Sequence, residues 1–484
     1  MTTPASVEAA WEMIVGLEVH VQLKTRTKAF CACATTFGAP PNTNVCPVCL
    51  ALPGALPVLN AHAVELAVRA ALALNCRVNP TSIFARKNYF YPDLPSGYQI
   101  TQFEQPLACD GYLVIGTRDD RSPVRIGITR IHLEEDAGKS LHDRYEGHTA
   151  IDLNRAGTPL IEIVSEPVLR SREQVGAYLR LLKQTLEYMA VSDVSMEEGS
   201  LRVDANVSVR RRGETGLGTR TEVKNLNSFS AVERAVEWEL ARQAALLEGG
   251  GHVEQETLVW DGTAARPSRT KEGSADYRYF PEPNLPPLIL AGAWIERMRG
   301  ALPELPGARR ARFATMYKLG ENAINVLTAN PAVSDYFESV VRAHGDARTA
   351  ANWVMGDVLG QVKARGTDIF SFAVRPADLG QLLDLIRDGV VTDTAARRIF
   401  ARMLETSDPP VHIAEREGLL QVGDADELSR WLDEAMAELP EETARLRNGE
   451  RRLVGVLIGA AVRKSGGRAD PRKLDQLLAE RLAT

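Results

Sequence analysis

The sequence has no apolar run long enough to cross a bilayer, because charged residues interrupt every long helix candidate, so we expect no membrane-spanning segment. The N-terminus lacks a basic stretch followed by an apolar one, and we therefore expect no signal peptide. Cysteine is scarce, since six cysteines in 484 residues are too few for a disulfide scaffold. Together these absences favour a cytoplasmic protein.

The sequence has no excess of basic residues and no common nucleotide-binding motif. The formal charge of −6 argues against a generally basic, nucleic-acid-binding surface, although a local basic patch is compatible with it. The patterns G-x-x-x-x-G-K-[ST] and G-x-G-x-x-G are absent, so neither P-loop nor Rossmann chemistry is indicated. G-x-S-x-G is absent too, so no acyl-transfer triad is indicated.

The pattern of elements changes along the chain, and a chain of this length predicts two to four domains. Up to about residue 290, alternating segments such as 14–23 and 159–164 are interspersed with helix candidates, which is typical of an α+β domain on an antiparallel sheet. Proline-rich breaks follow at 281–287 and 407–410, and strand signals disappear after the first. We therefore expect an α+β domain over 1–295, an all-α domain over 296–409 and a small all-α tail over 410–484.

Three helices of the first domain have predicted starts. Asn60 is a suitable N-cap for a helix over 61–74. Ser171 with Gln174 forms a capping box ahead of an amphipathic run to about Met189, and Ser230 with Glu233 forms another.

Four of the six cysteines follow the opening strand in the pattern C-x-C-x12-C-x2-C: Cys31, Cys33, Cys46 and Cys49. Two close pairs on separate turns suit tetrahedral Zn²⁺, and four thiolates leave no open coordination position. The alternative is a set of buried, unligated cysteines. We expect a structural zinc knuckle over 31–49.

The opening strand carries the first candidate site residues. In Ile14–Leu23 the alternation of a strand places Glu18, His20 and Gln22 on one side and an apolar row on the other. Taken alone, this window is equally compatible with an ordinary strand that has a wet outer face.

Later strand-like segments add further carboxylates. Glu134, Glu135 and Asp136 lie in the segment IHLEEDAGKS, a run that by itself is usually a solvated surface. Glu162 lies between two isoleucines in PLIEIVSEP, where a carboxylate needs a partner. Hard oxygen ligands on strands of one sheet suit Mg²⁺, which also contacts substrate phosphates. Candidate phosphate-binding groups are Lys87 and the pair Lys224 and Asn225 before a helix.

The joint presence of GLEVHVQL, RKNYFYPDLPSGYQITQFEQP, HLEEDAGKS, DLNRAGTPLIEIVSEP, EEGSLRVDANVS, EVKNLNSF and DYRYFPEP resembles the B-subunit family (GatB) of tRNA-dependent amidotransferases. The resemblance covers essentially the whole chain. It implies a cradle-like catalytic domain on a largely antiparallel sheet, then a helical domain and a tail domain. It also implies ATP-dependent phosphorylation of the side-chain carboxylate of Glu or Asp esterified to tRNA, followed by amidation to Gln-tRNA(Gln) or Asn-tRNA(Asn).

The resemblance also implies roles for particular residues and partners. Glu18, His20, Glu135 and Glu162 would form the Mg²⁺ and catalytic cluster, and Lys87 would contact phosphates of ATP. The roles of Glu134 and Asp136 are not separable from that of Glu135 by sequence. The cysteines match the zinc-binding form of the family, and zinc would be structural because some members lack them. The implied partners are the glutaminase (A) subunit, which supplies ammonia, the small (C) subunit, the misacylated tRNA and the cognate non-discriminating aminoacyl-tRNA synthetase.

The end of the chain is locally basic. The candidate tRNA contacts flank the apolar segment LVGVLIGAAV: Arg451, Arg452, Arg463 and Lys464. A solvated basic helix face is the alternative, but a basic end in an acidic protein is a reasonable footprint for an RNA backbone. A competing hypothesis for the whole chain is a non-catalytic, zinc-stabilised RNA-binding protein. The acidic clusters argue against it, because a purely RNA-binding surface would not collect them.

Overall fold

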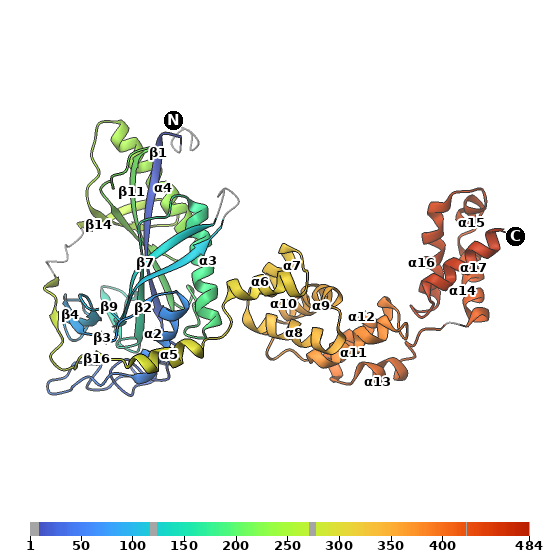
Figure 1. Cartoon of the computed structure of the whole chain (residues 1–484), viewed down its shortest axis with the longest axis horizontal. Coiled ribbons are helices and arrows are strands. Elements are labelled where there is room, and N and C mark those ends of the chain that lie inside the picture. The colour runs from blue at the N-terminus through green and yellow to red at the C-terminus, as the bar shows by residue number, and fades with distance from the viewer. Residues whose placement is uncertain (1–8, 117–122, 271–276, 423, 484) are drawn as a thin grey trace. The chain divides into compact units, whose positions relative to one another are not determined.

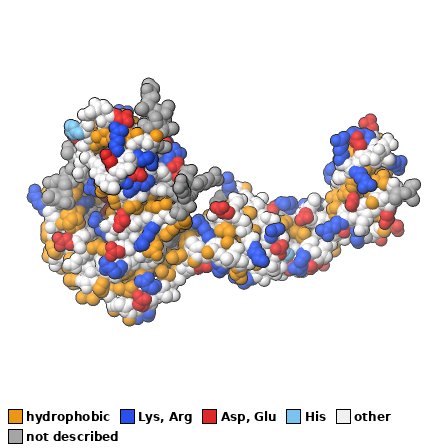
Figure 2. Space-filling model, turned by 45° about the horizontal axis from the view of Figure 1, so that its top comes forward, with side chains coloured by type: hydrophobic (Ala, Val, Ile, Leu, Met, Phe, Trp, Pro, Cys, Tyr) orange, Lys and Arg blue, Asp and Glu red, His pale blue; other side chains and the backbone are white. Residues whose placement is uncertain are grey.

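The computed structural model describes residues 9–116, 123–270, 277–422 and 424–483. The chain forms two compact units, which comprise residues 1–306 and 307–484 (Figure 1). The first unit contains the strands and the second is helical. On the face displayed in Figure 2, basic and acidic side chains are interspersed over both units, as the small net charge predicts. Among the described residues, no helix is long and apolar enough to cross a membrane.

A nine-stranded sheet organises the first unit, in the order β14-β13-β12-β11-β1-β10-β7-β6-β2. Every neighbouring pair is antiparallel except β12 and β13, which are parallel. The prediction of an α+β fold on a largely antiparallel sheet is confirmed. The strands are β1 (Trp11–Gln22), β2 (Arg77–Val78), β6 (Ala108–Ile115), β7 (Val124–Glu135), β10 (Pro159–Ser165), β11 (Leu201–Arg211), β12 (Thr221–Leu226), β13 (Glu256–Trp260) and β14 (Ala265–Thr270).

One face of this sheet is the main hydrophobic core. On β1 the apolar row Val15, Leu17, Val19 and Val21 is buried, as the alternation predicts. Three helices pack on this face: α2 (Ala61–Ala73), α3 (Arg172–Tyr188) and α4 (Phe229–Glu248). The polar row of β1 therefore faces the opposite side of the sheet.

The helix starts test the capping predictions. Asn60 caps α2 through its side chain, and Ser171 caps α3 by accepting a hydrogen bond from the backbone N–H of Gln174, so both predictions are confirmed. The third was wrong by two residues, because Ser228 rather than Ser230 caps α4. Ser228 accepts from the N–H of Ala231, which satisfies one of the free donors at the helix start.

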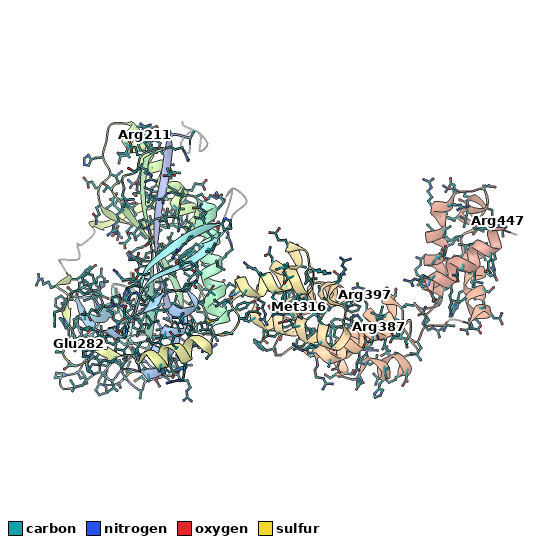
Figure 3. The ribbon with its side chains drawn as sticks, viewed as in Figure 1. Arg211, Glu282, Met316, Arg387, Arg397 and Arg447 are labelled. Atoms are coloured by element: carbon teal, nitrogen blue, oxygen red, sulfur yellow. The ribbon has the colours of Figure 1, made fainter. Side chains whose placement is uncertain are left out.

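Smaller sheets complete the first unit. β4 (Phe84–Asn88) pairs with β5 (Tyr98–Gln102) and β15 (Phe280–Pro281), and β5 packs against the end of β7. Arg86 of β4 donates to Glu282, which Figure 3 labels, at 2.5 and 3.0 Å. The remaining elements are β3 (Thr81–Ser82), β8 (Lys139–Tyr145), β9 (His148–Asp152), β16 (Leu288–Ile289) and α5 (Gly292–Gly300).

The second unit has two separate hydrophobic cores. One includes buried residues from Phe313 to Leu419, and the other includes residues from Leu428 to Leu478. The expected boundary at 409/410 would separate Ile413 and Ala414 from the first of these cores, in which they are buried. The helices are α6 (Pro306–Met316), α7 (Glu321–Leu327), α8 (Pro331–His344), α9 (Ala347–Trp353), a π-helical turn (Val354–Val358), α10 (Leu359–Arg365), α11 (Pro376–Arg387), α12 (Asp393–Thr406), α13 (Pro410–Arg416), α14 (Ala425–Glu438), α15 (Pro440–Arg447), a 3-10 turn (Arg451–Leu453), α16 (Val454–Lys464) and α17 (Pro471–Ala483).

Candidate active site

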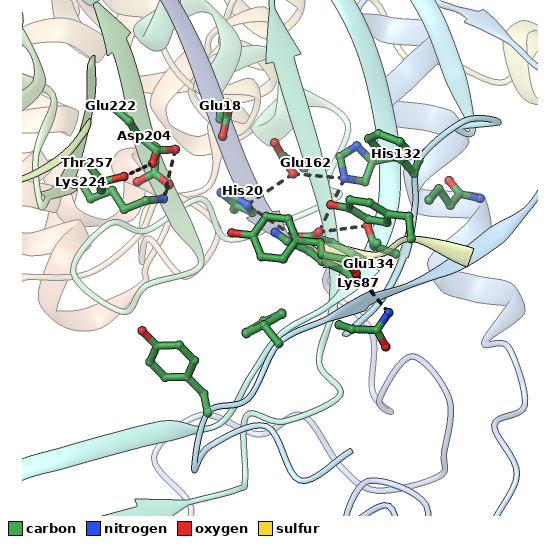
Figure 4. A pocket seen from close by; sticks show the side chains of 18 of the residues that line it. Glu18, His20, Lys87, His132, Glu134, Glu162, Asp204, Glu222, Lys224 and Thr257 are labelled. Carbon is green, nitrogen blue, oxygen red and sulfur yellow. Dashed lines mark hydrogen bonds and ion pairs between the residues drawn. The ribbon is translucent and has the colours of Figure 1, made fainter. Parts of the chain in front are cut away.

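A cavity of 1040 Å³ lies over the polar face of the large sheet. Charged side chains from β1, β7, β10, β11 and β12 form one wall, and Lys87 of β4 enters from the smaller sheet (Figure 4). Tyr89, Tyr277 and Tyr279 add aromatic surface. The cavity therefore combines carboxylates, bases and aromatic rings.

Strand register sets the centre of this site. His20 of β1 pairs with Glu162 of β10, and Glu162 pairs with His132 of β7, so the three side chains stand in one row across three strands. In-register neighbours of this kind are close enough to interact directly. The carboxylate oxygen of Glu162 lies 3.1 Å from Nε2 of His132 and 3.7 Å from Nε2 of His20.

Glu134 joins this row from β7, two residues beyond His132. Its carboxylate lies 3.5 Å from Nε2 of His20 and accepts a hydrogen bond from the hydroxyl of Thr101 at 3.3 Å. Ligand atoms of His20, Glu134 and Glu162 all lie within 4.8 Å of one another, and we call these residues the first ligand trio. One imidazole and two carboxylates at this spacing can share a divalent cation.

The structure does not bring Glu135 into the cavity, and this part of the predicted cluster is corrected. Adjacent residues of a strand point to opposite faces, so Glu134 and Glu135 cannot both face the cavity. The carboxylate of Glu135 accepts from the backbone N–H of Ile100 at 3.1 Å and lines a separate 210 Å³ pocket beside Cys31 and Cys49. Burial without a cation raises the pKa of Glu135 to about 7.

His132 is a site residue that the sequence reasoning missed. It is fully enclosed, and its Nδ1 has no hydrogen-bond partner in the described structure. Burial alone would lower the pKa of His132, but Glu162 and Glu134 outweigh it and raise the pKa to about 9. His132 in turn holds the pKa of Glu162 well below its usual range, against the effect of burial. Each member of the pair therefore favours the charged form of the other.

Glu18 belongs to a second trio rather than to the first, which corrects the single predicted cluster. It pairs across the strands with Asp204 of β11, and Glu222 of β12 completes a group whose ligand atoms lie within 4.8 Å of one another. The ammonium of Lys224 lies 2.5 Å from Asp204 and 3.5 Å from Glu222. Burial would lower the pKa of Lys224, but these two carboxylates raise it. Asp204 and Glu222 had no sequence signal beyond strand alternation.

Lys87, which the sequence suggested as a phosphate-binding residue, lines the cavity. Its ammonium lies 4.8 Å from the ring centre of Tyr277 and 5.7 Å from that of Tyr89. Burial lowers the pKa of Lys87, but the surrounding tyrosines and glutamates, with Tyr279 and Glu134 first among them, together have the larger effect and raise it. The side chain is thus a cation held between aromatic rings and the carboxylates.

Gln22 and Asp136 form a structural group outside the cavity. Gln22 donates to Asp136 at 2.8 Å, so it is not the solvated residue of a wet strand face. Asp136 also meets Arg202 at 3.0 Å and Arg155 at 3.5 Å. These two guanidinium groups outweigh burial and lower the pKa of Asp136. The charge of Asp136 is therefore neutralised by neighbouring arginines.

The cysteine quartet converges as its spacing predicts. The four sulfur atoms lie within 4.8 Å of one another, and none forms a disulfide. Tetrahedral coordination with Zn–S bonds of about 2.3 Å requires S···S separations of about 3.8 Å, which the quartet can reach with small side-chain adjustments. A hydrogen bond from the Cys31 thiol and the ammonium of Lys28 help to lower the pKa of Cys49 to about 4, which favours its thiolate form.

The predicted tRNA contacts lie at two ends of one helical segment in the second unit. Arg451 and Arg452 form the 3-10 turn before α16, and Arg463 and Lys464 are in its last turn. Lys464 makes an ion pair with Glu438 at 2.5 Å, and Arg452 lies 3.6 Å from Glu450. The basic character of this surface is thus partly neutralised by acidic neighbours.

Comparisons with known proteins match the sequence of this chain to one family. Residues 13–296 match the model of the GatB/GatE catalytic domain, and residues 335–482 match a GatB domain. The B subunit of the aspartyl/glutamyl-tRNA(Asn/Gln) amidotransferase of Prosthecochloris aestuarii is 47% identical over 98% of this chain and 98% of its own length. The B subunits of the same name from Moorella thermoacetica and Geobacter sulfurreducens are each 48% identical over 98% of this chain and 100% and 99% of their own lengths. The first model alone spans more than half of the chain, and the chain therefore belongs to the GatB family, the B subunits of aspartyl/glutamyl-tRNA amidotransferases.

Proposed function

We propose that this chain is the catalytic B subunit of a glutamine-dependent amidotransferase that converts Glu-tRNA(Gln) or Asp-tRNA(Asn) to Gln-tRNA(Gln) or Asn-tRNA(Asn). The observation that carries the proposal is the cavity of 1040 Å³, in which the five carboxylates of the two trios and two histidines stand on one face of the large sheet and Lys87 enters from the smaller sheet. The family relatives carry the name of this activity. A non-catalytic RNA-binding protein is not supported, because such a protein has no use for this buried acidic centre.

The chemistry requires activation of an unreactive carboxylate. An oxygen of the tRNA-borne carboxylate attacks the terminal phosphorus of ATP, and the bond from that phosphorus to ADP breaks with its electron pair on ADP. Ammonia from the glutaminase then attacks the acyl carbon, and phosphate leaves. Phosphoryl transfer depends on positioning and charge neutralisation more than on protein nucleophiles. The cavity offers both, since cationic Lys87 and the ligand trios line it.

We propose that His20, Glu134 and Glu162 hold the Mg²⁺ ion that accompanies ATP. Their ligand atoms lie within 4.8 Å of one another, and both carboxylates offer the hard oxygen ligands that Mg²⁺ prefers. When bound, the ion supplies neutralisation of phosphate charge. The second trio of Glu18, Asp204 and Glu222 already has Lys224 as its cation, so a second ion there has to compete with an ammonium group.

Neighbouring glutamates provide a sharp test of this assignment. Glu134→Gln removes a charged ligand from the first trio, and we expect kcat/KM for amidation to fall at least about a hundredfold. Glu135→Gln makes the same chemical change at the adjacent residue. Because the side chain of Glu135 faces away from the cavity, we expect a much smaller loss of kcat/KM. Formation of Gln-tRNA by the complex with the A and C subunits is the measurement, with tRNA binding as the control. Equal losses in the two variants would refute the division between the two strand faces.

We propose that the cysteine quartet binds one structural Zn²⁺ ion. The segment 31–49 begins with one pair of these cysteines and ends with the other, and the four sulfur atoms lie within 4.8 Å of one another. The ammonium of Lys28 balances part of the thiolate charge. Because all four positions are thiolates, the ion would hold the loop rather than activate water.

Metal content of purified variants tests this zinc site. We expect about one zinc per chain in the wild type and a loss of most of it in Cys46→Ser, since three thiolates bind zinc far more weakly than four. Cys109→Ser is the matched control, because Cys109 lies outside the quartet and contacts Asn79 instead. The amount of zinc is measured by atomic emission. An undiminished zinc content in Cys46→Ser would refute the proposed zinc site.

The domain plan and the partners form part of the same proposal. We propose a cradle-like catalytic domain up to about residue 306, a helical domain through α13 and a tail that begins before α14, which adjusts the expected boundaries of 295 and 409 to the observed cores. The A and C subunits, the misacylated tRNA and the cognate non-discriminating synthetase are the proposed partners. We propose that the basic residues around α16 contact the tRNA backbone. Arg447, which Figure 3 labels, lies nearby in sequence at the end of α15.

The salt dependence of tRNA binding tests the tail. Replacing both Arg451 and Arg452 by Gln removes two phosphate-neutralising charges, and we expect weaker binding with a log–log salt slope shallower by roughly 1.5. The control replaces Arg375 and Arg387, two exposed arginines of the helical region that already pair with aspartates. Filter binding of tRNA at several salt concentrations gives both slopes. An unchanged slope in the tail variant would contradict the proposed contact.

A further inference from the structure

Arg130 lies on the same face of β7 as His132 and Glu134, and it lines the main cavity. The pairing of β7 with β10 shifts by one residue between Ile128 and Arg130, which is a β-bulge. Because of this shift, Ile128 and Ile131 both face the core, while Arg130 faces the cavity. Two residues along a strand span about 7 Å, so Arg130 begins about that far from His132.

The guanidinium of Arg130 lacks a counter-charge in the described structure. Its Nε is buried without any hydrogen-bond acceptor, and the described residues include no carboxylate within ion-pair distance of it. Other part-buried arginines of the same unit are paired, since Arg86 binds Glu282 and Arg202 binds Asp136. The nearby acids of the first trio are instead occupied by the histidines.

A buried donor without an acceptor, such as the Nε–H of Arg130, is costly because burial removes its water without replacing the lost hydrogen bond. A buried polar atom without a partner in a native fold therefore calls for an explanation, and a ligand that completes it is one of the standard explanations. Guanidinium groups fit phosphate oxygens particularly well, because their planar fork donates two parallel hydrogen bonds. The guanidinium of Arg130 thus has the chemistry of a phosphate-binding group in an otherwise acidic wall.

We propose that Arg130 binds the terminal phosphate of ATP next to the first ligand trio. The inference rests on the proposed function and adds a residue to it. The terminal phosphate is favoured over an RNA phosphodiester because Arg130 shares its strand face with Glu134, one of the residues that would hold Mg²⁺, and a bound Mg²⁺ would supply charge neutralisation to the ATP phosphates beside it. Arg130 donates hydrogen bonds to non-bridging oxygens of the phosphoryl group as it moves from ADP to the carboxylate. It keeps its protons throughout, and none of its own covalent bonds changes.

Nucleotide binding and kinetics of three variants test this proposal in the complex with the A and C subunits. Arg130→Met keeps the length of the side chain and removes the fork, whereas Arg130→Lys keeps only the charge. We expect Arg130→Met to weaken binding of MgATP roughly ten- to a hundredfold, as for loss of a charged hydrogen bond, with a smaller effect on MgADP. Arg130→Lys should lie between the wild type and Arg130→Met. Arg125→Met is the control, because Arg125 lies on the same strand, is exposed and stacks on Tyr112 outside the cavity.

The outcomes separate the inference from the function on which it rests. A wild-type complex without ATP-dependent amidation would overturn the proposed function itself. A wild type that is active, with Arg130→Met equal to Arg125→Met in MgATP affinity, would overturn the role of Arg130 alone. A raised KM for tRNA with an unchanged affinity for MgATP would assign Arg130 to an RNA phosphate and contradict the proposal. Thermal unfolding of each variant shows that the fold is retained, and Arg130→Lys provides the second readout if Arg130→Met unfolds early.

Discussion

The alternation of side chains on three paired strands governs the rest of this structure. β1, β10 and β7 bury Val19, Ile163 and Ile131 on one face, and the register then places His20, Glu162 and His132 in a row on the other. Because a shift of one residue would turn the whole polar row into the core, the hydrophobic face fixes the geometry of the site. Packing of α2, α3 and α4 on the apolar face therefore also holds the side chains of this polar row in place.

Charge balance explains how this acidic centre is stable before any ligand binds. His132 stands between Glu134 and Glu162, Lys87 adds a cation above them, and Lys224 serves the second trio. These internal cations lower the cost of burying several carboxylates together. The same cations are the groups that phosphate would meet, so one arrangement can balance the carboxylates and also attract a phosphate group. Arg130 departs from the pattern, because it lines the cavity and its Nε is buried without an acceptor among the residues that the structure describes.

The sequence was sufficient for features that depend on local periodicity and spacing. Alternation identified Glu18 and His20, ligand spacing identified the quartet that begins at Cys31, and the cap at Asn60 was found from residue type. It failed where the answer depended on which strands pair and in which register. Glu134 and Glu135 are chemically identical, and only the phase of β7, shifted by its bulge, decides which one faces the cavity. His132, Asp204 and Glu222 likewise become site residues through cross-strand pairing, which no single segment reveals.

The position of a divalent cation tests the central claim, that one face of β7 with its partners on β1 and β10 forms the phosphoryl-transfer site. The most direct measurement is anomalous diffraction from crystals of the complex grown with Mn²⁺ and a non-hydrolysable ATP analogue. The account predicts a manganese peak in contact with His20, Glu134 and Glu162, next to the terminal phosphate. A peak coordinated by Glu135, or bound nucleotide with no manganese at these three residues, would contradict it.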